Sequence, residues 1–395
     1  MKLWQTNRLK RINLLEGSVS SGKTWISLVL WAFWVRTMPD KPDNLYLMTA
    51  KSLTTLKNNC LYLLQSLVGE SNFKFNTGGK EGWLFGRHIL FEGANDISSE
   101  SKIRGLTLTG AYCDEATKLP RDFFVMLLSR LRRPGAKLFA TTNPDSPTHW
   151  LKTDYIDRKD ELSFLDITFR LDDNAQNLPA EYVENLKLEY TGIFYDRFIL
   201  GLWTLAEGLI YPMYEKALAE PPSKPAERYI LSIDYGTQNP LACLIWAKIE
   251  GIWYAVDGYY YSGRDTGKQK TDKEYADKLD SIVAPYFEGT KLRTIVDPSA
   301  ASFIEELRRH KLYQVIQADN DVLNGIRETA SAIEQGKIKI SPKLKEWRDE
   351  AASYIWNENE MPTKENDHYM DATRYFVKTE KIIRGKKPYH YIWNG

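Results

Sequence analysis

Apolar residues in the first half of the chain form short runs that alternate with stretches of helical periodicity. Short apolar runs bounded by turn residues are typical of buried strands, whereas longer periodic stretches indicate helices. The predicted strands are residues 12–16, 44–50, 108–113 and 137–142, with a hairpin in 83–92, and the predicted helices are residues 22–36, 53–67 and 122–131. Strands that alternate with helices predict a mainly parallel sheet with both faces covered.

The second half has a different order of predicted elements. Three strands come first, at residues 228–234, 241–249 and 252–261. The later predicted strands are 294–297 and 313–318, and the predicted helices are 272–287, 302–310, 322–335, 342–354 and 367–377. A meander of three strands followed by alternating helices and strands is the element order of an RNase H-like fold.

A segment with few periodic apolar residues separates the two halves. Residues 201–228 read GLWTLAEGLIYPMYEKALAEPPSKPAER and contain four prolines, which interrupt regular structure. A chain of 395 residues is expected to form two domains, because one core rarely grows past about 250–300 residues. The predicted division is residues 1–205, a linker at 206–226, and residues 227–395, which end in a basic tail.

Composition excludes several classes of protein. The net charge is +1, so nucleic acid would have to be bound through local basic patches. The first residues lack the apolar core of a signal peptide, and the longest apolar run is about half of a membrane span. The few cysteines fit a reducing cytoplasm better than a disulfide scaffold. They are Cys60, Cys113 and Cys243. We expect a soluble protein that is not secreted and binds no membrane.

The first predicted strand runs into a glycine-rich turn, GSVSSGKT, that fits the phosphate-loop pattern GxxxxGK[ST] in full. Backbone N–H groups of such a loop and of the following helix point at the β-phosphate of a nucleotide. Lys23 is expected to reach the β- and γ-phosphates, and the Thr24 hydroxyl to bind Mg²⁺. The alternative is a turn that matches by chance, which the flanking strand and helix argue against. The predicted nucleotide-binding residues here are Gly17, Ser20, Ser21, Gly22, Lys23 and Thr24.

The strand at 108–113 ends in two acids, Asp114 and Glu115. Asp114 is expected to hold Mg²⁺ through water, and Glu115 to orient and deprotonate the attacking water. Most such pairs are solvated surface, but this one lies at a strand end downstream of a phosphate loop. Asn143, in the sequence TTNP that ends the next strand, is a candidate sensor of the γ-phosphate. A plain turn is the alternative there, because Asn-Pro favours turns.

Other residues of the first half are candidates for completing this site. Arg104 lies just upstream of the acidic strand and is a candidate arginine finger, which would stabilise charge on the transferred phosphoryl group. Near the start of the chain, Gln5 and Trp4 are candidates for adenine recognition. A cluster that is better explained as cations at the end of a helix consists of Arg130, Arg132 and Arg133.

Three acids in the second half occupy positions where they are expected to converge. Asp234 ends the first strand of the meander, and Asp297 ends the strand at 294–297. Asp371 lies in the last helix, where it shares a face with Asp367. Neighbouring strands bring the first two acids together, and the helix can lay the third across them. Each acid alone would usually be surface, so only the full set points to a site.

Three converging carboxylates stay ionised together only when cations neutralise them. Two Mg²⁺ or Mn²⁺ ions would do so, one activating water and the other stabilising the leaving oxygen of a phosphodiester. The predicted metal ligands are Asp234, Asp297 and Asp371. His368 is a further candidate, as a metal ligand or proton carrier, with local packing at the start of the helix as the alternative.

Two basic patches are candidates for contact with DNA phosphates, which would make binding sensitive to salt. Ordinary solvated charge explains each patch equally well. The patches consist of Lys337, Lys339, Lys343 and Lys345, and of Lys381, Arg384, Lys386 and Lys387.

Together these residues resemble the large terminase subunit of tailed double-stranded DNA bacteriophages. The resemblance covers nearly the whole chain and includes the phosphate loop, the Asp114–Glu115 pair, the sequence TTN at 141–143, and the sequences IDYG, VDPSA and DHYMDATRY. It implies an α/β fold, with an ASCE-type P-loop ATPase domain built on a mainly parallel sheet and followed by an RNase H-like nuclease domain.

The resemblance also implies an activity. Large terminases use ATP and Mg²⁺ to pump double-stranded DNA into an empty procapsid, and they cut concatemeric DNA. The expected partners are DNA, the portal protein and a small terminase subunit. The expected assembly is a pentameric ring on the portal, formed from monomers in the cytoplasm of the bacterial host. Asp234, Asp297 and Asp371 match the metal-binding triad of the family, and Arg104 matches a finger that acts across the ring.

One departure and two rival functions are open at this stage. The phosphate loop lacks the arginine that many relatives carry, so the source of any cation in cis is undecided. A translocase whose second half only binds DNA would hydrolyse ATP without cutting, and a ring-forming scaffold would bind nucleotide without turnover. The three acids argue against the first rival, and Glu115 argues against the second. The sequence indicates neither the phage, the packaging strategy nor the cleavage preference.

Overall fold

The chain divides into two compact units, which we describe separately. A computed structural model describes residues 8–76, 78–236, 240–287 and 289–383. One unit holds the chain up to Glu184 together with Gly192–Leu205, and the other holds Asn185–Thr191 and the chain from Ala206 onward. The segment predicted as a linker, residues 206–226, is part of the second unit. There the Ile210 N–H donates to the carbonyl of Tyr354 at 2.8 Å.

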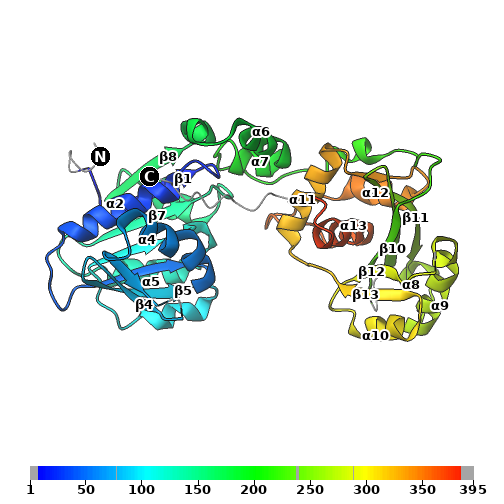
Figure 1. The fold of residues 1–395 in the computed structure, drawn as a ribbon, viewed down its shortest axis with the longest axis horizontal. Helices are drawn as coiled ribbons and strands as arrows, with labels where there is room; N and C mark the ends of the chain where they lie inside the picture. The colour runs from blue at the N-terminus through cyan, green and yellow to red at the C-terminus, as the bar shows by residue number, and fades with distance from the viewer. Residues whose placement is uncertain (1–7, 77, 237–239, 288, 384–395) are drawn as a thin grey trace. The chain divides into compact units, whose positions relative to one another are not determined.

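Within the described residues, the first unit contains an eight-stranded sheet in the order β3-β4-β5-β2-β6-β7-β1-β8. The strands from β5 to β8 in this order pair in parallel, whereas β3 and β4 form an antiparallel extension at one edge (Figure 1). The strands are β1 (Ile12–Gly17), β2 (Leu45–Ala50), β3 (Phe73–Phe75), β4 (Glu81–Leu84), β5 (Arg87–Gly93), β6 (Gly110–Cys113), β7 (Lys137–Thr142) and β8 (Phe164–Phe169).

The core of the first unit lies on both faces of this sheet. Strand β1 is buried along its whole length, as expected of a parallel strand with both faces covered. On one face, Trp31 and Trp34 of the first long helix pack with their ring centroids 5.6 Å apart. A Cβ on Gly110 would lie 2.3 Å from the Trp34 ring, so the glycine makes room for the tryptophan.

The helices predicted at residues 22–36, 53–67 and 122–131 are present with one local change, whereas the helices at residues 180–189 and 192–198 were not predicted. The single helix predicted at 53–67 contains a π-helical turn, η1 (Lys57–Leu61), and such turns are frequent at functional sites. The α-helices are α2 (Lys23–Thr37), α3 (Leu53–Leu56), α4 (Tyr62–Val68), α5 (Arg121–Arg130), α6 (Ala180–Glu189) and α7 (Gly192–Phe198), of which α6 runs from the first unit into the second. The other helical turns are η2 (Ile97–Ile103), η3 (Ala116–Lys118), η4 (Lys152–Ile156) and η5 (Leu171–Asn177).

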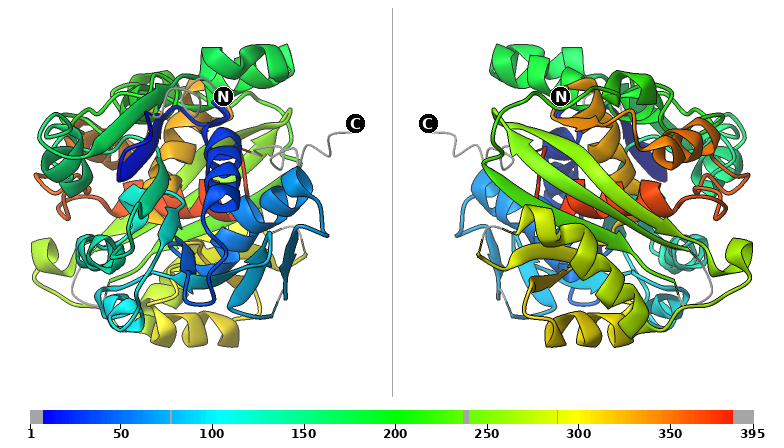
Figure 2. Two further views of the ribbon diagram at one scale, coloured as in Figure 1. Left: turned by 90° about the vertical axis from the view of Figure 1, so that its left-hand side faces the viewer. Right: turned by 90° about the vertical axis from the view of Figure 1, so that its right-hand side faces the viewer.

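The second unit contains, among its described residues, a six-stranded sheet in the order β13-β12-β9-β10-β11-β14. Strands β9, β10 and β11 form an antiparallel meander, whereas β12 and β13 run parallel to β9. The long β10–β11 pair is visible in the right-hand view of Figure 2. The strands are β9 (Arg228–Asp234), β10 (Leu241–Ile249), β11 (Ile252–Tyr261), β12 (Leu292–Val296), β13 (Tyr313–Gln317) and β14 (Ile338–Ile340).

Helices cover both faces of the second sheet. Helices α9 and α10 supply core side chains on one face, and α13 packs on β9 and β10 from the other (Figure 1). Phe376 of α13 stacks on Trp246 of β10 with centroids 4.1 Å apart. The helices are α8 (Gly263–Thr266), α9 (Asp272–Val283), α10 (Ala301–Arg309), α11 (Val322–Glu334), α12 (Lys345–Ser353) and α13 (His368–Thr379), with the short turns η6 (Tyr214–Ala217) and η7 (Ala284–Tyr286).

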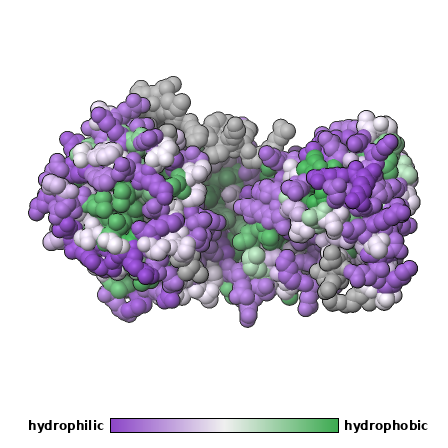
Figure 3. Space-filling view, turned by 90° about the horizontal axis from the view of Figure 1, so that it is seen from below, coloured by the Kyte–Doolittle hydropathy of each residue, from purple (hydrophilic) through white to green (hydrophobic). Residues whose placement is uncertain are grey.

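The surface is mainly hydrophilic, with smaller hydrophobic areas, on the face seen in Figure 3. Among the described residues, no helix combines the length and the apolar content needed to cross a bilayer. The three cysteines are buried and unpaired.

Candidate functional site

The phosphate loop connects β1 to α2 and requires glycine at two positions. Gly17 has a φ of +130°, and a Cβ there would lie 1.9 Å from the carbonyl oxygen of Phe169. Gly22 has a φ of +81°, a left-handed conformation that glycine adopts without strain. Within the loop, Ser21 Oγ donates to the Ser18 carbonyl at 2.7 Å. The glycines and the internal hydrogen bond therefore stabilise the conformation of the loop.

The start of the loop is also fixed from outside. The Ser18 N–H donates to the Phe169 carbonyl of β8 at 2.9 Å, and the Val19 N–H donates to the Phe198 carbonyl of α7 at 2.8 Å. The Ser18 hydroxyl donates to the Ile199 carbonyl at 2.7 Å. Strand β8, which the sequence pattern did not predict, and the end of α7 thus hold one side of the loop.

Lys23 lies at the centre of this site. Its Nζ donates to the Ser18 carbonyl at 2.8 Å and to Asn143 Oδ1 at 2.6 Å. Burial lowers the pKa of Lys23 to about 8, although Asp114 and Glu115 act against that shift. A buried ammonium held by neutral acceptors is a site that would gain from a bound anion.

Asp114 and Glu115 follow β6, and the neighbouring parallel strand β7 brings the sequence TTN beside them. Thr141 Oγ1 donates to Asp114 Oδ1 at 2.8 Å, and Asn59 Nδ2 donates to Asp114 Oδ2 at 3.0 Å. Glu115 has a φ of +51°, a strained conformation for this residue type. Burial and then the Asp114 charge raise the pKa of Glu115, the direction that suits a general base.

The far side of the loop is held by residues that the sequence did not single out. Ser20 has a φ of +55°, and its hydroxyl lies 2.7 Å from the Tyr182 hydroxyl. Asn174 Nδ2 donates to the Ser20 carbonyl at 2.8 Å. Thr24, half-buried in the first turn of α2, lies where N–H groups of a helix have no partner within the helix.

In the second unit, Asp234 and Asp297 are placed side by side by strand register. Strands β9 and β12 are parallel and pair Ile233 with Val296, so each acid is the next residue at the same edge of the sheet. Neighbouring strands lie about 4.8 Å apart. These two carboxylates therefore come from adjacent strand ends, as predicted from the sequence.

His368 opens α13 and contacts the first of these acids. His368 Nδ1 lies 2.9 Å from Asp234 Oδ2. Burial raises the pKa of Asp234 to about 6, although the His368 bond acts against that shift. Burial opposes the charged form of His368, but the bond to Asp234 raises its pKa above the ordinary value. The hydrogen bond therefore favours the charged forms of both groups.

Asp371 and Asp297 are linked by a chain of polar side chains rather than by direct contact. Arg374 donates to Asp371 Oδ1 through Nη2 at 2.9 Å and Nε at 3.2 Å. Arg374 Nη1 donates to Asn320 Oδ1 at 2.9 Å, and Asn320 Nδ2 donates to Asp297 Oδ2 at 3.1 Å. The Tyr375 hydroxyl donates to the same Asp297 oxygen. Both acids are therefore held by donors from α13 or the loop before α11.

Two more buried acids lie beside this cluster. Glu350 Oε2 accepts the N–H groups of Tyr369 and Met370 at 2.6 and 3.3 Å, which caps the start of α13. Burial raises the pKa of Glu350 to about 8. Burial and then the Asp371 charge raise the pKa of Asp367. Glu350 Oε1 and Asp367 Oδ2 are buried without a hydrogen-bond partner.

These residues fit divalent cations, although they are not gathered at one point. Within the part of the chain that the structure describes, no three acidic, histidine or cysteine side chains are close enough together to hold a metal ion. However, the donor set is rich in carboxylates, which Mg²⁺ and Mn²⁺ prefer. Glu350 Oε1, which is buried without a hydrogen-bond partner, and the raised pKa of Asp234 also indicate a deficit of positive charge.

A family model and solved structures that are similar to this chain both point to one protein family. Residues 14–216 match the family described as terminase large subunit, T4likevirus-type, N-terminal. No curated protein matches the chain. Among solved structures, the large terminase of a thermophilic bacteriophage is 36% identical and has a TM-score of 0.81, with 94% of each chain covered.

Two further crystal structures of that thermophilic phage protein are similar to this chain and contain nucleotides. The complex with ADP is 36% identical with a TM-score of 0.80 and 94% of each chain covered. The complex with ATP-gamma-S is 35% identical with a TM-score of 0.78 and 93% of each chain covered. The chain belongs to the large terminase family.

Membership places this terminase in a family of packaging motors with an ATPase and a nuclease domain. The predicted α/β fold class is confirmed by the two sheets and by the match to the thermophilic phage terminase along 94% of the chain. The roles of individual residues are not decided by this likeness, and they stay predictions.

Arg104 of this terminase lies at the surface of its unit. It follows η2, its side chain is 68% exposed, and Nη2 donates to Glu100 Oε1 at 2.9 Å. Its carbonyl accepts a bond from Arg130, which suits the local role that we preferred for that arginine cluster. Gln5, the candidate for adenine recognition, lies outside the described residues.

The candidate DNA patches are only partly described. Lys337, Lys343 and Lys345 are exposed, whereas Lys339 is half-buried and donates to the Lys216 carbonyl at 2.7 Å. In the tail, Lys381 is exposed, and the predictions for residues 384–387 lie outside the described residues.

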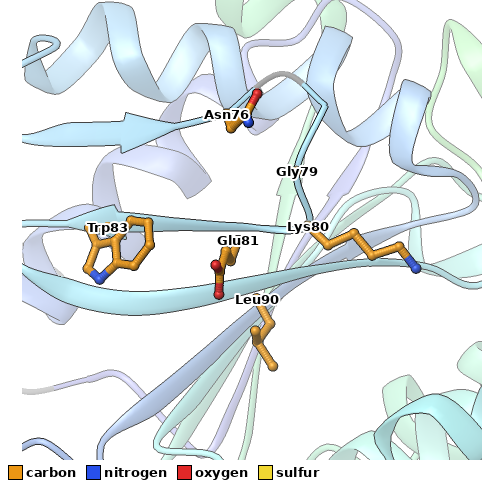
Figure 4. Close-up of a pocket in the computed structure, with 6 residues that line it drawn as sticks. All are labelled: Asn76, Gly79, Lys80, Glu81, Trp83 and Leu90. Carbon is orange, nitrogen blue, oxygen red and sulfur yellow. The ribbon is translucent and has the colours of Figure 1, made fainter.

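One surface pocket of this terminase lies away from the predicted nucleotide-binding residues, at the antiparallel edge of the first sheet (Figure 4). Trp83 there stacks on His88 with centroids 5.4 Å apart. None of the predicted site residues lines this pocket. It is lined by Asn76, Gly79, Lys80, Glu81, Trp83 and Leu90.

Proposed function

We propose that this terminase hydrolyses ATP to move double-stranded DNA into a procapsid, and that its second unit cuts concatemeric DNA with two divalent ions. The observation that carries the proposal is the meeting of Lys23 with Asn143, next to Asp114 and Glu115, at the ends of β6 and β7. A buried cation beside two acids and a phosphate loop supports ATP hydrolysis.

In the ATPase site, each residue has a separate task. The helix N-terminus and Lys23 bind the β- and γ-phosphates, and Thr24 and Asp114 hold the ion. Mg²⁺ would neutralise charge on the phosphate oxygens. Glu115 accepts the proton of the attacking water. Lys23 Nζ donates to Asn143 Oδ1 at 2.6 Å, so Asn143 lies beside the group that binds the γ-phosphate in this proposal.

In the nuclease site, Asp234, Asp297 and Asp371 would hold the divalent ions. Bound there, two ions would activate water and stabilise the leaving oxygen. His368 orients Asp234 through Nδ1, and its imidazole, whose pKa is raised by the bond to Asp234, is the group that would give a proton to the departing strand end.

Assembly completes the motor in this proposal. Arg104, exposed on its own unit, acts as a finger on the nucleotide of a neighbouring copy in a pentameric ring docked on the portal. A small terminase subunit selects the DNA. The exposed lysines at 337–345 contact the phosphates of the DNA. The site of action is the cytoplasm of the bacterial host, at the procapsid portal.

The two halves of the proposal are tested by a double comparison. Plasmid cleavage with Mn²⁺ and phosphate release with Mg²⁺ and ATP are measured for Glu115→Ala and Asp297→Ala. We expect Glu115→Ala to lose about 10²–10⁴-fold in ATPase rate and to cut normally. We expect Asp297→Ala to lose cleavage and to keep its ATPase rate.

Matched controls are Glu70→Ala and Asp277→Ala, exposed acids in the first and second units. If Asp297→Ala cuts plasmid normally, the metal-binding assignment is wrong. If the unaltered protein hydrolyses ATP but cuts under no divalent ion, the chain is a translocase. Nucleotide binding without turnover would make it a scaffold.

A further inference from the structure

We infer that Arg374 is a positioning residue of the proposed nuclease, which orients the Asp371 carboxylate directly and the Asp297 carboxylate through Asn320. This inference rests on the proposed cleavage function and concerns residues outside the predicted triad. It is carried by the bonding and packing of one buried side chain on α13.

Arg374 is 1% exposed, so its charge must be compensated inside the protein. Two of its N–H groups donate to Asp371 Oδ1, at 2.9 and 3.2 Å, and neither of them donates to Oδ2. This arrangement fixes the rotation of the carboxylate and leaves the second oxygen as the one that can bind a cation. A planar guanidinium makes such a two-point contact, and a lysine ammonium does not.

The neighbouring helix is built to admit this side chain. A Cβ on Gly325 of α11 would lie 2.6 Å from Arg374 Cγ and 2.9 Å from Cδ. Only glycine therefore leaves room for the aliphatic part of Arg374 at this crossing. The guanidinium also lies 4.7 Å from the centre of the Tyr375 ring. These contacts restrict Arg374 to one position.

The same arginine connects the two carboxylates. Its third donor reaches Asn320 at 2.9 Å, and Asn320 donates to Asp297 Oδ2, which also accepts the Tyr375 hydroxyl. The other oxygen of Asp297 accepts the Ser299 N–H at 2.7 Å. Consecutive residues of α13 thus orient acids that belong to different elements, and a shift of the helix would move both carboxylates.

Groups that orient ligating carboxylates affect metal affinity strongly. Removing one typically costs about 10–100-fold in metal affinity or activity. Because Arg374 acts on the geometry of the ligands, its loss should raise the Mn²⁺ concentration needed for cleavage. An excess of Mn²⁺ should then restore the rate, which a general loss of folding would not allow.

The experiment uses the full chain without nucleotide. Mn²⁺ binding is measured from the EPR signal of free Mn²⁺ and from the shift in melting temperature on adding Mn²⁺. Plasmid cleavage is titrated with Mn²⁺, the melting temperature without Mn²⁺ checks folding, and the ATPase rate checks that the first unit is unaffected. For Arg374→Gln we expect an about 10–100-fold higher Mn²⁺ midpoint, cleavage recovered at high Mn²⁺, and an ATPase rate within about 2-fold of normal. Arg374→Lys should fall between Gln and the native residue.

Three comparison variants complete the series. Lys378→Gln removes a cation of the same helix that pairs with Glu328 at 2.9 Å, and it should leave the midpoint unchanged. Gly325→Ala displaces Arg374 without removing it and should reproduce the Arg374→Gln defect. Asn320→Ala removes only the link to Asp297 and should give a smaller shift.

The inference is overturned if Arg374→Gln binds Mn²⁺ with the native midpoint, or if excess Mn²⁺ leaves its cleavage defect unchanged. Should Arg374→Gln fail to fold, a native midpoint in both Gly325→Ala and Asn320→Ala overturns it instead. Asp297→Ala separates the two levels of proposal. If it binds Mn²⁺ and cuts normally, the nuclease assignment itself is wrong, whereas if it is inactive and Arg374→Gln is normal, only the role of Arg374 is wrong.

Discussion

The two candidate sites differ in the balance of their buried charges, because the first combines Lys23 with Asp114 and Glu115 and the second is dominated by acids. The nucleotide site has a buried cation, Lys23, whose pKa burial lowers to about 8. The second site has an excess of buried acids around Arg374 and His368. The buried acids are Asp297, Glu350, Asp367 and Asp371, and Asp234 beside them is half-buried.

This difference shows which ligand each site would stabilise. A buried lysine with a lowered pKa gains from a bound anion, which is what a polyphosphate supplies. Burial raises the pKa of Asp234 to about 6 and that of Glu350 to about 8, so these acids gain from a bound cation. Burial of these groups therefore favours a bound anion at Lys23 and bound cations at Asp234 and Glu350.

The arginines of the two units differ in the same way. Arg374 is 1% exposed and already bonded to the acids that it is proposed to orient. Arg104 is on the surface, 68% exposed in its side chain, in an ion pair with Glu100. The acid cluster thus contains its arginine, whereas the candidate arginine of the nucleotide site lies on the surface of its unit. In the proposed ring, Arg104 would act on the nucleotide of a neighbouring copy.

The largest effect is expected from removing this exposed arginine. Arg104→Ala should lower the ATPase rate of the motor docked on procapsids by about 10³-fold or more, because a finger stabilises transition-state charge. The isolated chain should keep its ATPase rate, and its stability should change by less than about 1 kcal/mol, since an exposed ion pair contributes little. Phosphate release with and without procapsids measures the difference.

Arg121→Ala is the matched control, because Arg121 is also an exposed arginine paired with an acid, Asp154. Arg121→Ala should change the ATPase rate of neither the isolated chain nor the docked motor. An equal loss for Arg104→Ala in the isolated chain and in the docked motor would place Arg104 within its own site and end the contrast with Arg374.

Much of the nucleotide site was predictable because its chemistry is local in sequence. The loop GSVSSGKT is contiguous, and the ends of parallel strands meet by geometry, so Asp114 and Asn143 could be placed from pattern alone. Asn59 and Tyr182 could not, because each reaches the site from a distant segment that carries no motif. The π-helical turn that contains Asn59 has no signature in a continuous helical pattern.

The sequence predicted the positions of two acids of the cluster at strand ends, but not the hydrogen bonds that hold the acids. Asp234 and Asp297 followed from strand ends, yet the structure links Asp297 to Asp371 only through intervening side chains. Arg374 had a detectable signal, because residues three apart on a helix face one another and Asp371 is three residues earlier. Glu350 had none, since it caps α13 from another helix.

A smaller effect is expected from removing the buried cation itself. A lysine whose folded-state pKa is about 8, against 10.5 in the unfolded chain, costs stability at all pH values below about 8. The cost, about 3 kcal/mol, disappears as the pH rises from 8 to 10.5. Lys23→Met should therefore be inactive but, without nucleotide at pH 7, more stable than the native protein. Each hydrogen bond lost with the lysine reduces this gain in stability by about 1 kcal/mol.

Urea unfolding between pH 7 and pH 10 measures this difference. The advantage of Lys23→Met should shrink as the pH rises, whereas Lys345→Met, at an exposed lysine, should show no such trend. A difference that stays constant with pH would mean that Lys23 is not under electrostatic strain, and the contrast in charge between the two sites would fail.

The smallest effect concerns how firmly the nucleotide site is formed before its ligand arrives. Ser20 has a φ of +55°, and one of the groups holding it there is the Tyr182 hydroxyl at 2.7 Å. Tyr182→Phe removes about 1 kcal/mol of hydrogen bonding, so the KM for ATP should rise about 5-fold with kcat unchanged. Tyr62→Phe, at an exposed tyrosine, is the control. If kcat falls while KM is constant, the Tyr182 hydroxyl acts on the chemical step, and the loop is not formed in advance as the acid cluster is.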